Sequence, residues 1–288
     1  MDVSPNKVAN KISTNKLSIP LANSSNAANK INRSFQMPKS TRDNLEYLYT
    51  NNQQTTNNKI KHDKLGLYHQ NIRGISKKME ELTTQWATQF PHLLCFTEHH
   101  LKDSELTHIN IEHYTLGASY CRQSRTRGGV GIFVHNTLSY STINLNKFCN
   151  DYDLEACTIQ LIIPPNIYNI LCIYRPPTGN FTTFLMHLEA ILTQLHTNAS
   201  NLIVCGDINV NYLQESRNKS LLNSLLPSFN LHSAVNFPTR ISNSSSTTID
   251  NIFIGKNKNK DYSIIPTSNL IMTSRLYTYM MLIFQLNR

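Results

Sequence analysis

Hydrophobic residues become regularly spaced only from about residue 65 of the 288-residue chain. Residues 1–64 are rich in Asn, Ser, Thr and Lys and show no sustained apolar period. Such a composition buries too little apolar surface to offset the entropy lost when a chain becomes ordered. We therefore expect residues 1–64 to form a disordered basic arm and a folded domain to begin at residue 65.

Strand-like and helix-like patterns alternate through the rest of the chain. Seven short apolar runs with the character of strands lie at 65–69, 93–97, 130–135, 156–163, 168–174, 202–205 and 248–254. Stripes with spacings of three and four residues predict helices at 75–90, with Ser76 as a candidate N-cap, at 184–195 and at 221–226. Early alternation of strand and helix, followed by consecutive strands, predicts an α/β protein with mixed sheets.

The formal charge of +9 is concentrated at the two ends of the chain. Residues 1–64 contain ten Lys/Arg and four Asp/Glu (+6), residues 65–254 contain twelve and thirteen (−1), and residues 255–288 contain five and one (+4). A near-neutral globular part with basic flanks suits a nucleic-acid enzyme. On charge alone, however, solubility is the simpler explanation.

The six cysteines and the apolar segments favour an intracellular protein without a membrane span. The cysteines form no Cys-x-x-Cys pair, and four of them lie in apolar runs, which is typical of buried reduced thiols. The N-terminus lacks the apolar core of a signal peptide. The longest apolar stretch near the C-terminus, at 276–286, has about 11 residues and is too short to cross a bilayer.

Polar residues follow or open several of the predicted strands. They are Asn71, Glu98, Tyr174, Asp207 with Asn209, and Asp250. Taken singly, an Asp or Asn after a strand is more often a turn former or a helix cap. Taken together, in this order and spacing, they indicate a site built at the ends of strands.

The order of these motifs resembles the endonuclease/exonuclease/phosphatase family, which includes pancreatic DNase and the apurinic/apyrimidinic endonucleases. Four pieces resemble its non-LTR (LINE-type) retrotransposon branch: Gln-Asn-Ile-Arg-Gly at 70–74, Arg-Gly-Gly-Val-Gly-Ile at 127–132, Tyr-Arg-Pro-Pro at 174–177 and Gly-Asp-Ile-Asn at 206–209. The resemblance covers about residues 65–265, some two-thirds of the chain, and we place the truncated domain at 65–268. It implies a four-layer, DNase-I-like α/β sandwich in which two packed mixed β-sheets are flanked by helices.

The resemblance implies a divalent metal, normally Mg²⁺ and in the alternative Mn²⁺. Glu98 would ligate the ion, and Asn71 would support the metal and the phosphate beside it, because hard ions take oxygen ligands. Arg73 stands where many relatives carry a further carboxylate. His99 and His100 adjoin Glu98, but neighbouring side chains on an extended segment point in opposite directions, so both cannot be ligands.

The resemblance also assigns the groups that would handle the phosphodiester. Asp207 would polarise or deprotonate the attacking water, and Asn209 would orient that water or hold a phosphoryl oxygen. Tyr174 would hydrogen-bond the scissile phosphate. The reaction would leave a 3′-hydroxyl that a reverse transcriptase can extend, with charge on the phosphoryl oxygens offset by cations.

Arginines near these motifs are weaker candidates for contacts with DNA phosphate. Arg127 and Arg175 are the two positions we select, and Arg122 and Arg125 lie close to the first of them. A solvated turn that carries several arginines explains the first group equally well. Glu155 is a candidate for a polar contact in the site, although a surface salt bridge is the simpler interpretation.

The family pattern ends with Ser-Asp-His, whose His is essential and would be hydrogen-bonded by Asp250. This sequence contains no Ser-Asp-His, and the corresponding place reads Asn269-Leu270-Ile271-Met272-Thr273. That peptide can be encoded by AAT CTG ATC ATG ACN, which read from its third base gives TCT GAT CAT GAC, or Ser-Asp-His-Asp. We therefore expect that a frameshift between about 251 and 268 has truncated the domain and replaced its end with an aberrant tail at 269–288. A natural lineage with a divergent tail is the alternative.

The sequence predicts a Mg²⁺-dependent DNA endonuclease domain of a retroelement that is impaired by loss of its terminal motif. Its partners would be DNA and, in an intact element, a reverse transcriptase domain of the same polyprotein, with no membrane. Its location would be intracellular, and nuclear when it acts on DNA. Two alternatives remain: a non-catalytic nucleic-acid-binding remnant, and a phosphatase of the same superfamily that acts on small phosphate esters.

Overall fold

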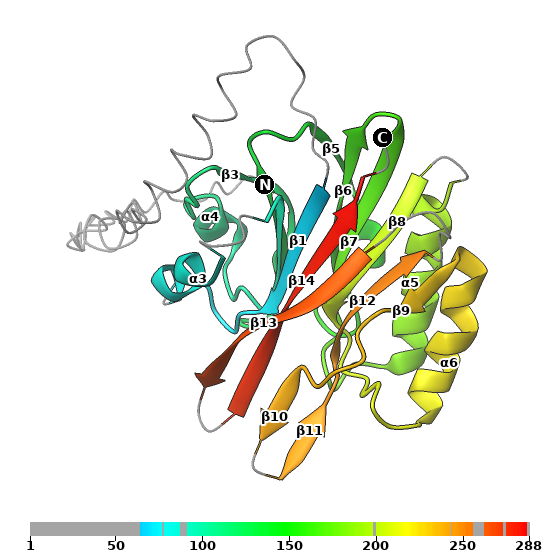
Figure 1. Ribbon diagram of the computed structural model, residues 1–288. Helices are drawn as coiled ribbons and strands as arrows, with labels where there is room; N and C mark the ends of the chain where they lie inside the picture. Colours follow the sequence, from blue (N-terminus) through cyan, green and yellow to red (C-terminus); the bar gives the residue numbers. More distant parts are fainter. Residues whose placement is uncertain are drawn as a thin grey trace, which may run out of the picture. The chain divides into compact units, whose positions relative to one another are not determined.

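The computed structural model describes residues 64–76, 78–86, 91–197, 200–242, 244–255, 262–272 and 275–286. The arm predicted at 1–64 lies outside these residues, apart from Lys64 at the start of the first strand. In the described ranges, strands alternate with helices in the first part of the chain and follow one another directly in the last part (Figure 1).

The described strands form two mixed sheets. In spatial order the first sheet contains β11 (Ser245–Thr247), β10 (Arg240–Ser242), β14 (Arg275–Gln285), β1 (Lys64–Asn71), β2 (Leu93–Thr97), β4 (Val130–His135) and β3 (Tyr114–Tyr120), with β13 (Tyr262–Met272) paired to β14. The second contains β5 (Tyr140–Ile143), β6 (Glu155–Ile163), β7 (Asn166–Tyr174), β8 (Ser200–Asp207), β12 (Asp250–Gly255) and β9 (Leu231–Ser233). The pairs β1–β2 and β7–β8 are parallel and the other pairs are antiparallel.

The helices lie on the outer faces of the sheets, so the fold has four layers. They are α3 (Met79–Trp86), α4 (Asp103–Leu106), α5 (Phe181–Leu195) and α6 (Arg217–Leu225), with short 3₁₀ turns at Asn146–Phe148 and Leu226–Phe229. Figure 1 shows α3 and α4 beside the first sheet and α5 and α6 beside the second. The predicted α/β sandwich is therefore confirmed. No helix in the described ranges is long and apolar enough to cross a membrane.

Three buried clusters hold the layers together. Leu67 of β1 and Ile170 of β7 belong to the cluster between the two sheets. Phe96 packs with Met79 of α3 on the outer face of the first sheet, and Val204 packs with Leu188 of α5 on the outer face of the second. Because both faces of the central strands are buried, their sequences are nearly continuous apolar runs, which is why the sequence identifies them.

The helix α5 illustrates how the sequence sets its own boundaries. Asn180 is its N-cap, and the side-chain oxygen accepts hydrogen bonds from the backbone N–H groups of Thr182 and Thr183. A cap of this kind satisfies donors that have no partner inside the helix. The helix predicted at 75–90 begins later than expected. In the structure α3 starts at Met79, and Ser76, the candidate N-cap, lies in the preceding turn.

The C-terminal segment, predicted to be an aberrant tail, forms a central strand of the first sheet. β14 lies between β1 and β10. Leu67 pairs with Leu282 across β1 and β14, and Met280 and Leu282 are fully buried between the sheets. Residues 280–284 are all apolar, and because successive side chains of a strand point to opposite faces, they fill both faces of the sheet. The frameshift origin of the tail stays a prediction.

Candidate active site

Four side chains lie in one row across the second sheet. Glu155 of β6 pairs with Tyr174 of β7, Tyr174 pairs with Asp207 of β8, and Asp207 pairs with Asp250 of β12. Paired positions in neighbouring strands project to the same face of a sheet. The sheet register therefore brings together residues that are about a hundred positions apart along the chain.

Asn71 links this row to the first sheet. It ends β1, and its position is paired with Thr97, the residue before Glu98. The amide nitrogen Nδ2 donates to Glu98 Oε1 at 2.8 Å and to Asp207 Oδ2 at 2.7 Å. Three residues that the sequence selects as site residues are thus joined by one amide at an end of the sandwich.

Asp207 is fully buried, and its carboxyl group is held on both oxygens. Oδ1 accepts from the backbone N–H of Asn209 at 3.0 Å, and Oδ2 accepts from Asn71. Burial and the neighbouring Asp250 raise the pKa of Asp207 to about 8, although Arg240, 3.9 Å from Oδ2, opposes the shift. A carboxyl group with a pKa near neutrality is suited to exchange a proton with a water molecule.

Glu98 adopts a left-handed backbone conformation, with φ of +54°, directly after β2. Burial would raise its pKa, but hydrogen bonds from His100 and Asn71 and the charge of Arg73 outweigh burial and lower the pKa to about 2. Glu98 is therefore an anion at neutral pH. Non-glycine residues in this conformation are uncommon and concentrate at functional sites.

The two histidines after Glu98 point to different surroundings, as the sequence predicts. His100 lies 3.2 Å from Glu98 Oε2, and the buried His99 lies 3.3 Å from the carbonyl oxygen of Tyr120. Burial lowers the pKa of His99 to about 4. Gly129 contacts the His99 ring so closely that an added Cβ would clash with it, which accounts for that glycine.

The donor atoms around Glu98 fit a hard divalent ion. Asn71 Oδ1 is buried and accepts no hydrogen bond from the described residues, and the Glu98 carboxylate lies beside it. A buried amide oxygen without a donor is costly unless a cation or a ligand satisfies it. Oxygen donors of this kind suit Mg²⁺, which keeps several of its waters.

Asn209, in the loop after β8, and Arg175, directly after β7, support the site. Asn209 has φ of +50°, and its Nδ2 donates to the carbonyl oxygen of Arg175 at 2.8 Å. The Arg175 guanidinium donates to the carbonyl oxygens of Ile208, Gly179 and Asn209, and the residue is only 4% exposed. The structure thus corrects our expectation that Arg175 faces DNA phosphate, because its donors are already used to hold this loop.

Glu155 and Arg122 form a buried ion pair behind Tyr174. Arg122 Nε donates to Glu155 Oε1 at 2.6 Å, and the guanidinium carbon lies 5.8 Å from the centre of the Tyr174 ring. Burial raises the pKa of the Tyr174 hydroxyl, so this group stays protonated and can donate. Glu155 is fully buried and is not the surface salt bridge that the sequence suggested.

Replacing Arg122 with Met should destabilise the protein by about 3–5 kcal/mol, because a buried charge would lose its partner. Burial raises the pKa of Glu155 to about 7 even beside Arg122. Removing the guanidinium of Arg122 should raise the pKa of Glu155 further. A carboxyl group whose folded-state pKa is raised stabilises the fold at low pH and loses this contribution as pH rises through that pKa. Urea unfolding should therefore show that Arg122→Met is most destabilising above about pH 7. The double variant Arg122→Met/Glu155→Gln should recover part of the loss, whereas a loss unchanged by pH or by Glu155→Gln would contradict the pairing.

Asp250 is held by a residue that the sequence analysis missed. Thr239 Oγ1 donates to Asp250 Oδ2 at 3.0 Å, and the adjacent Arg240 lies over Asp207. Asp250 Oδ1 is buried without a hydrogen-bond partner among the described residues, and it lies 3.7 Å from Nε2 of His69. No strand-like or helical pattern marks Thr239 and Arg240, so only the folded hairpin that starts at Arg240 reveals them.

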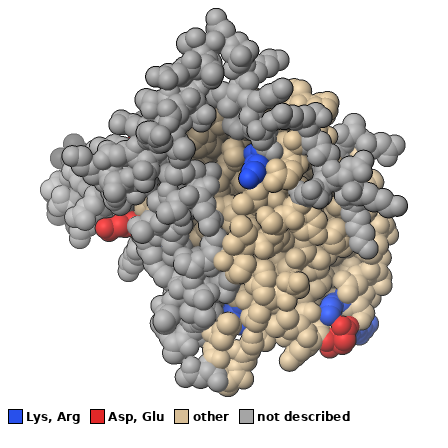
Figure 2. Space-filling model, in the orientation of Figure 1, with Lys and Arg blue, Asp and Glu red and all other residues tan. Residues whose placement is uncertain are grey.

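A pocket of about 230 Å³ is lined by His100, the neighbour of Glu98, and by several basic side chains. Its lining includes His100, Lys102, Arg122, Arg125 and Arg127. Lys102 and Arg122 are engaged within the protein, whereas Arg127 is exposed at the pocket. Figure 2, in the orientation of Figure 1, shows a described surface that is mostly neither basic nor acidic, with only a few small patches of Lys/Arg and Asp/Glu. Basic side chains therefore line the pocket, and the described surface in that view has no broad basic face.

The fold and this site define the class of the protein. The sequence model of the endonuclease/exonuclease/phosphatase family matches residues 69–267, and the chain belongs to that family. Its members include phosphodiester hydrolases and nucleases. No curated protein matches the chain in sequence.

Solved structures share the fold at low sequence identity. The endonuclease domain of TRAS1, a telomere-specific non-LTR retrotransposon, is 13% identical with a TM-score of 0.62, and the match covers 78% of this chain and 100% of that one. The AP endonuclease LMAP from Leishmania major is 14% identical with a TM-score of 0.61, covering 78% and 89%. TDP2 of D. rerio, complexed with a single-strand DNA product, is 12% identical with a TM-score of 0.58, covering 78% and 100%.

Proposed function

We propose that this chain is a Mg²⁺-dependent DNA endonuclease domain of a non-LTR retroelement, which nicks one strand and leaves a 3′-hydroxyl. The observation that carries the proposal is the link made by Asn71, whose amide joins Glu98 to Asp207. In an intact element a reverse transcriptase domain of the same polyprotein would extend the 3′-hydroxyl. The protein would act in the nucleus.

The side chains have separable tasks in this proposal. Glu98 and Asn71 Oδ1 would hold Mg²⁺, and the bound ion would stabilise charge on the phosphoryl oxygens. Asp207 would take a proton from the attacking water, and the N–H of Asn209 holds that carboxyl group in place. Tyr174 would donate a hydrogen bond from its hydroxyl group to a phosphate oxygen, and Arg240 would place a positive charge beside Asp207.

A non-catalytic remnant that still binds DNA is the second candidate. It is favoured by one observation: Asp250 Oδ1 lacks the hydrogen-bond donor that the family's Ser-Asp-His would supply. A remnant would keep the metal ligands and the fold, but its rate of DNA cleavage would be low. Binding and cleavage therefore have to be measured separately.

A nicking assay tests the proposal against these alternatives. Supercoiled plasmid would be incubated with the full chain in Mg²⁺ or in EDTA, and a small phosphate ester would serve as a parallel substrate. Nicking in Mg²⁺ alone supports the endonuclease, and DNA binding without nicking supports the remnant. Hydrolysis of the ester without nicking would assign the chain to a phosphatase and end the proposal.

Asp207→Asn and Glu98→Gln should respond differently to Mg²⁺. Because activity in the natural chain is expected to be low, both are best made in a chain whose Ser-Asp-His-Asp has been restored. Removing the Glu98 carboxylate weakens a metal ligand, so excess Mg²⁺ should recover part of the nicking rate. Removing the Asp207 carboxylate deletes the proton acceptor, so the rate should fall ~10²–10⁴-fold at every Mg²⁺ concentration. Identical metal titrations for the two variants would contradict this division of roles.

A further inference from the structure

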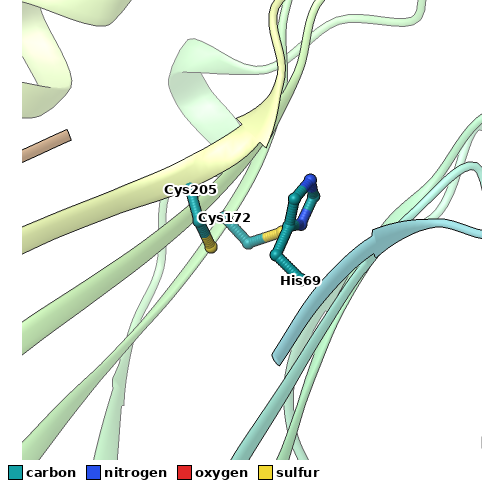
Figure 3. Close-up of side chains that lie close together, drawn as sticks. All are labelled: His69, Cys172 and Cys205. Atoms are coloured by element: carbon teal, nitrogen blue, oxygen red, sulfur yellow. The ribbon is translucent and has the colours of Figure 1, made fainter. Parts of the chain in front are cut away.

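A second group of potential ligands lies in the core, between the two sheets. His69 comes from β1, Cys172 from β7 and Cys205 from β8, and their donor atoms all lie within 4.8 Å of one another. All three residues are at most 1% exposed. Figure 3 shows the Cys172 side chain directed toward the His69 ring, with Cys205 beside it on the neighbouring strand.

The pairing of the strands gathers these side chains. Cys172 and Cys205 are partners across the parallel pair β7–β8, and His69 is the partner of Cys95 across the parallel pair β1–β2. Cys95 is buried in the same cluster as Cys172 and Cys205. Three thiols and one imidazole therefore lie in the core where the two sheets face each other, and His69, Cys172 and Cys205 are the three whose donor atoms come together.

The His69 ring has one nitrogen available for a ligand. Nδ1 lies 3.1 Å from the carbonyl oxygen of Cys95, which can only accept, so Nδ1 carries a proton. Nε2 is buried and makes no hydrogen bond among the described residues, and Asp250 Oδ1, an acceptor, lies 3.7 Å from it. Metal-binding histidines commonly donate the second ring N–H to a carbonyl or carboxylate in this way, which fixes the tautomer.

We propose that His69, Cys172 and Cys205 hold a Zn²⁺ ion in the core. Zinc takes nitrogen and sulfur ligands in tetrahedral sites, and closed sites of this kind contribute to folding. The donor set is chemically distinct from the oxygen ligands beside Glu98, since soft thiolates select zinc and hard oxygens select magnesium. The core site therefore does not depend on the proposed endonuclease activity.

An ion would have to displace a proton from this group, because burial would lower the pKa of His69 but its contacts with Asp250 and Cys205 raise that pKa to about 10. Burial would raise the pKa of Cys205, but hydrogen bonds from Cys172, Cys95 and His69, together with the charge on His69, hold it well below its usual range. Thiolate is the form that ligates a metal. The ion would replace the proton on His69 Nε2, so binding would release protons, and because the site is buried it would fill during folding.

Metal analysis of the full chain tests the site. Protein expressed in zinc-supplemented medium and dialysed against EDTA while folded should retain one Zn²⁺ per chain and release it on unfolding. Cys172→Ser and Cys205→Ser should each lose the ion. Cys157→Ser is the matched control, because Cys157 is buried on β6 opposite Cys172 and lies outside the three ligands; it should keep the ion.

A second measurement keeps the proposal testable if the serine variants do not fold. The unaltered chain folded with Co²⁺ in place of Zn²⁺ should develop thiolate-to-cobalt absorption bands in the near ultraviolet. Glu98→Gln should leave both the bands and the zinc content unchanged, whatever it does to nicking. A folded chain without zinc, with six free thiols or a Cys172–Cys205 disulfide, would overturn the proposal, as would an ion that Glu98→Gln removes.

Discussion

The fourfold variant Asn269→Ser/Leu270→Asp/Ile271→His/Met272→Asp should nick supercoiled plasmid at least ~10²-fold faster than the natural chain, since a positioned acid–base or electrostatic group contributes about that much. The reason lies at Asp250, whose Oδ1 is buried and lacks a hydrogen-bond donor among the described residues. A restored imidazole would fill that role and meet the phosphate beside Asp207. Initial rates of nicking in Mg²⁺ give the comparison.

The control for this experiment differs only in the imidazole. A variant with Ala in place of His at position 271, and the other three substitutions kept, should stay as slow as the natural chain. If both fourfold variants are fast, the gain comes from the added carboxylates. If both are slow, the tail at 269–288 did not replace a Ser-Asp-His segment, and the frameshift interpretation is wrong.

Deleting residues 273–288 should leave a chain that does not fold. These residues include β14, which lies between β1 and β10 in the first sheet. Met280, Leu282 and Phe284 pack between the sheets, and three such side chains contribute about 5–9 kcal/mol when each is worth roughly 1.5–3 kcal/mol. The whole stability of a domain is about 5–15 kcal/mol. Thermal unfolding followed by circular dichroism should show no cooperative transition in the deleted chain.

Point variants of the same strand provide a graded form of this prediction. Leu282→Ala should cost about 2–5 kcal/mol, because it removes a fully buried side chain. Gln285→Ala, an exposed position of the same strand, should change stability by no more than about 0.5 kcal/mol. A deleted chain that melts like the full chain, or equal effects of the two substitutions, would mean that the strand does not support the fold.

The sequence predicts most strands that are buried on both faces, with β14 the exception, and misses short or half-buried strands. The predicted run at 130–135 matches β4, because Val, Ile and Phe there are buried on both faces. The strand β3 was not predicted, because its half-buried residues include Gly117, Ser119 and Tyr120. The pair β10–β11 is short and polar, so no periodicity marks it.

The site was predictable where its residues adjoin apolar strands. Asn71, Glu98 and Asp207 stand directly at strand ends, and the structure brings all three together. The burial of Arg175 could not be predicted, since its partners are backbone carbonyls of a loop whose path the sequence does not reveal. Thr239 was not predicted for a similar reason, because it contacts Asp250 only through the fold of the chain.

If the chain is the retroelement domain proposed above, the row of Glu155, Tyr174, Asp207 and Asp250 determines how other copies of the gene would lose the site. Each residue comes from a different strand, and a shift of one residue in a strand sends every side chain to the opposite face. Substitutions in the loops would erode the sequence while the arrangement of these four groups survives. An in-frame insertion or deletion of one codon within any of the four strands would destroy the arrangement of these four side chains. Copies that have lost the site should therefore be recognised by small insertions or deletions within strands. Copies that carry only substitutions in the loops should keep it.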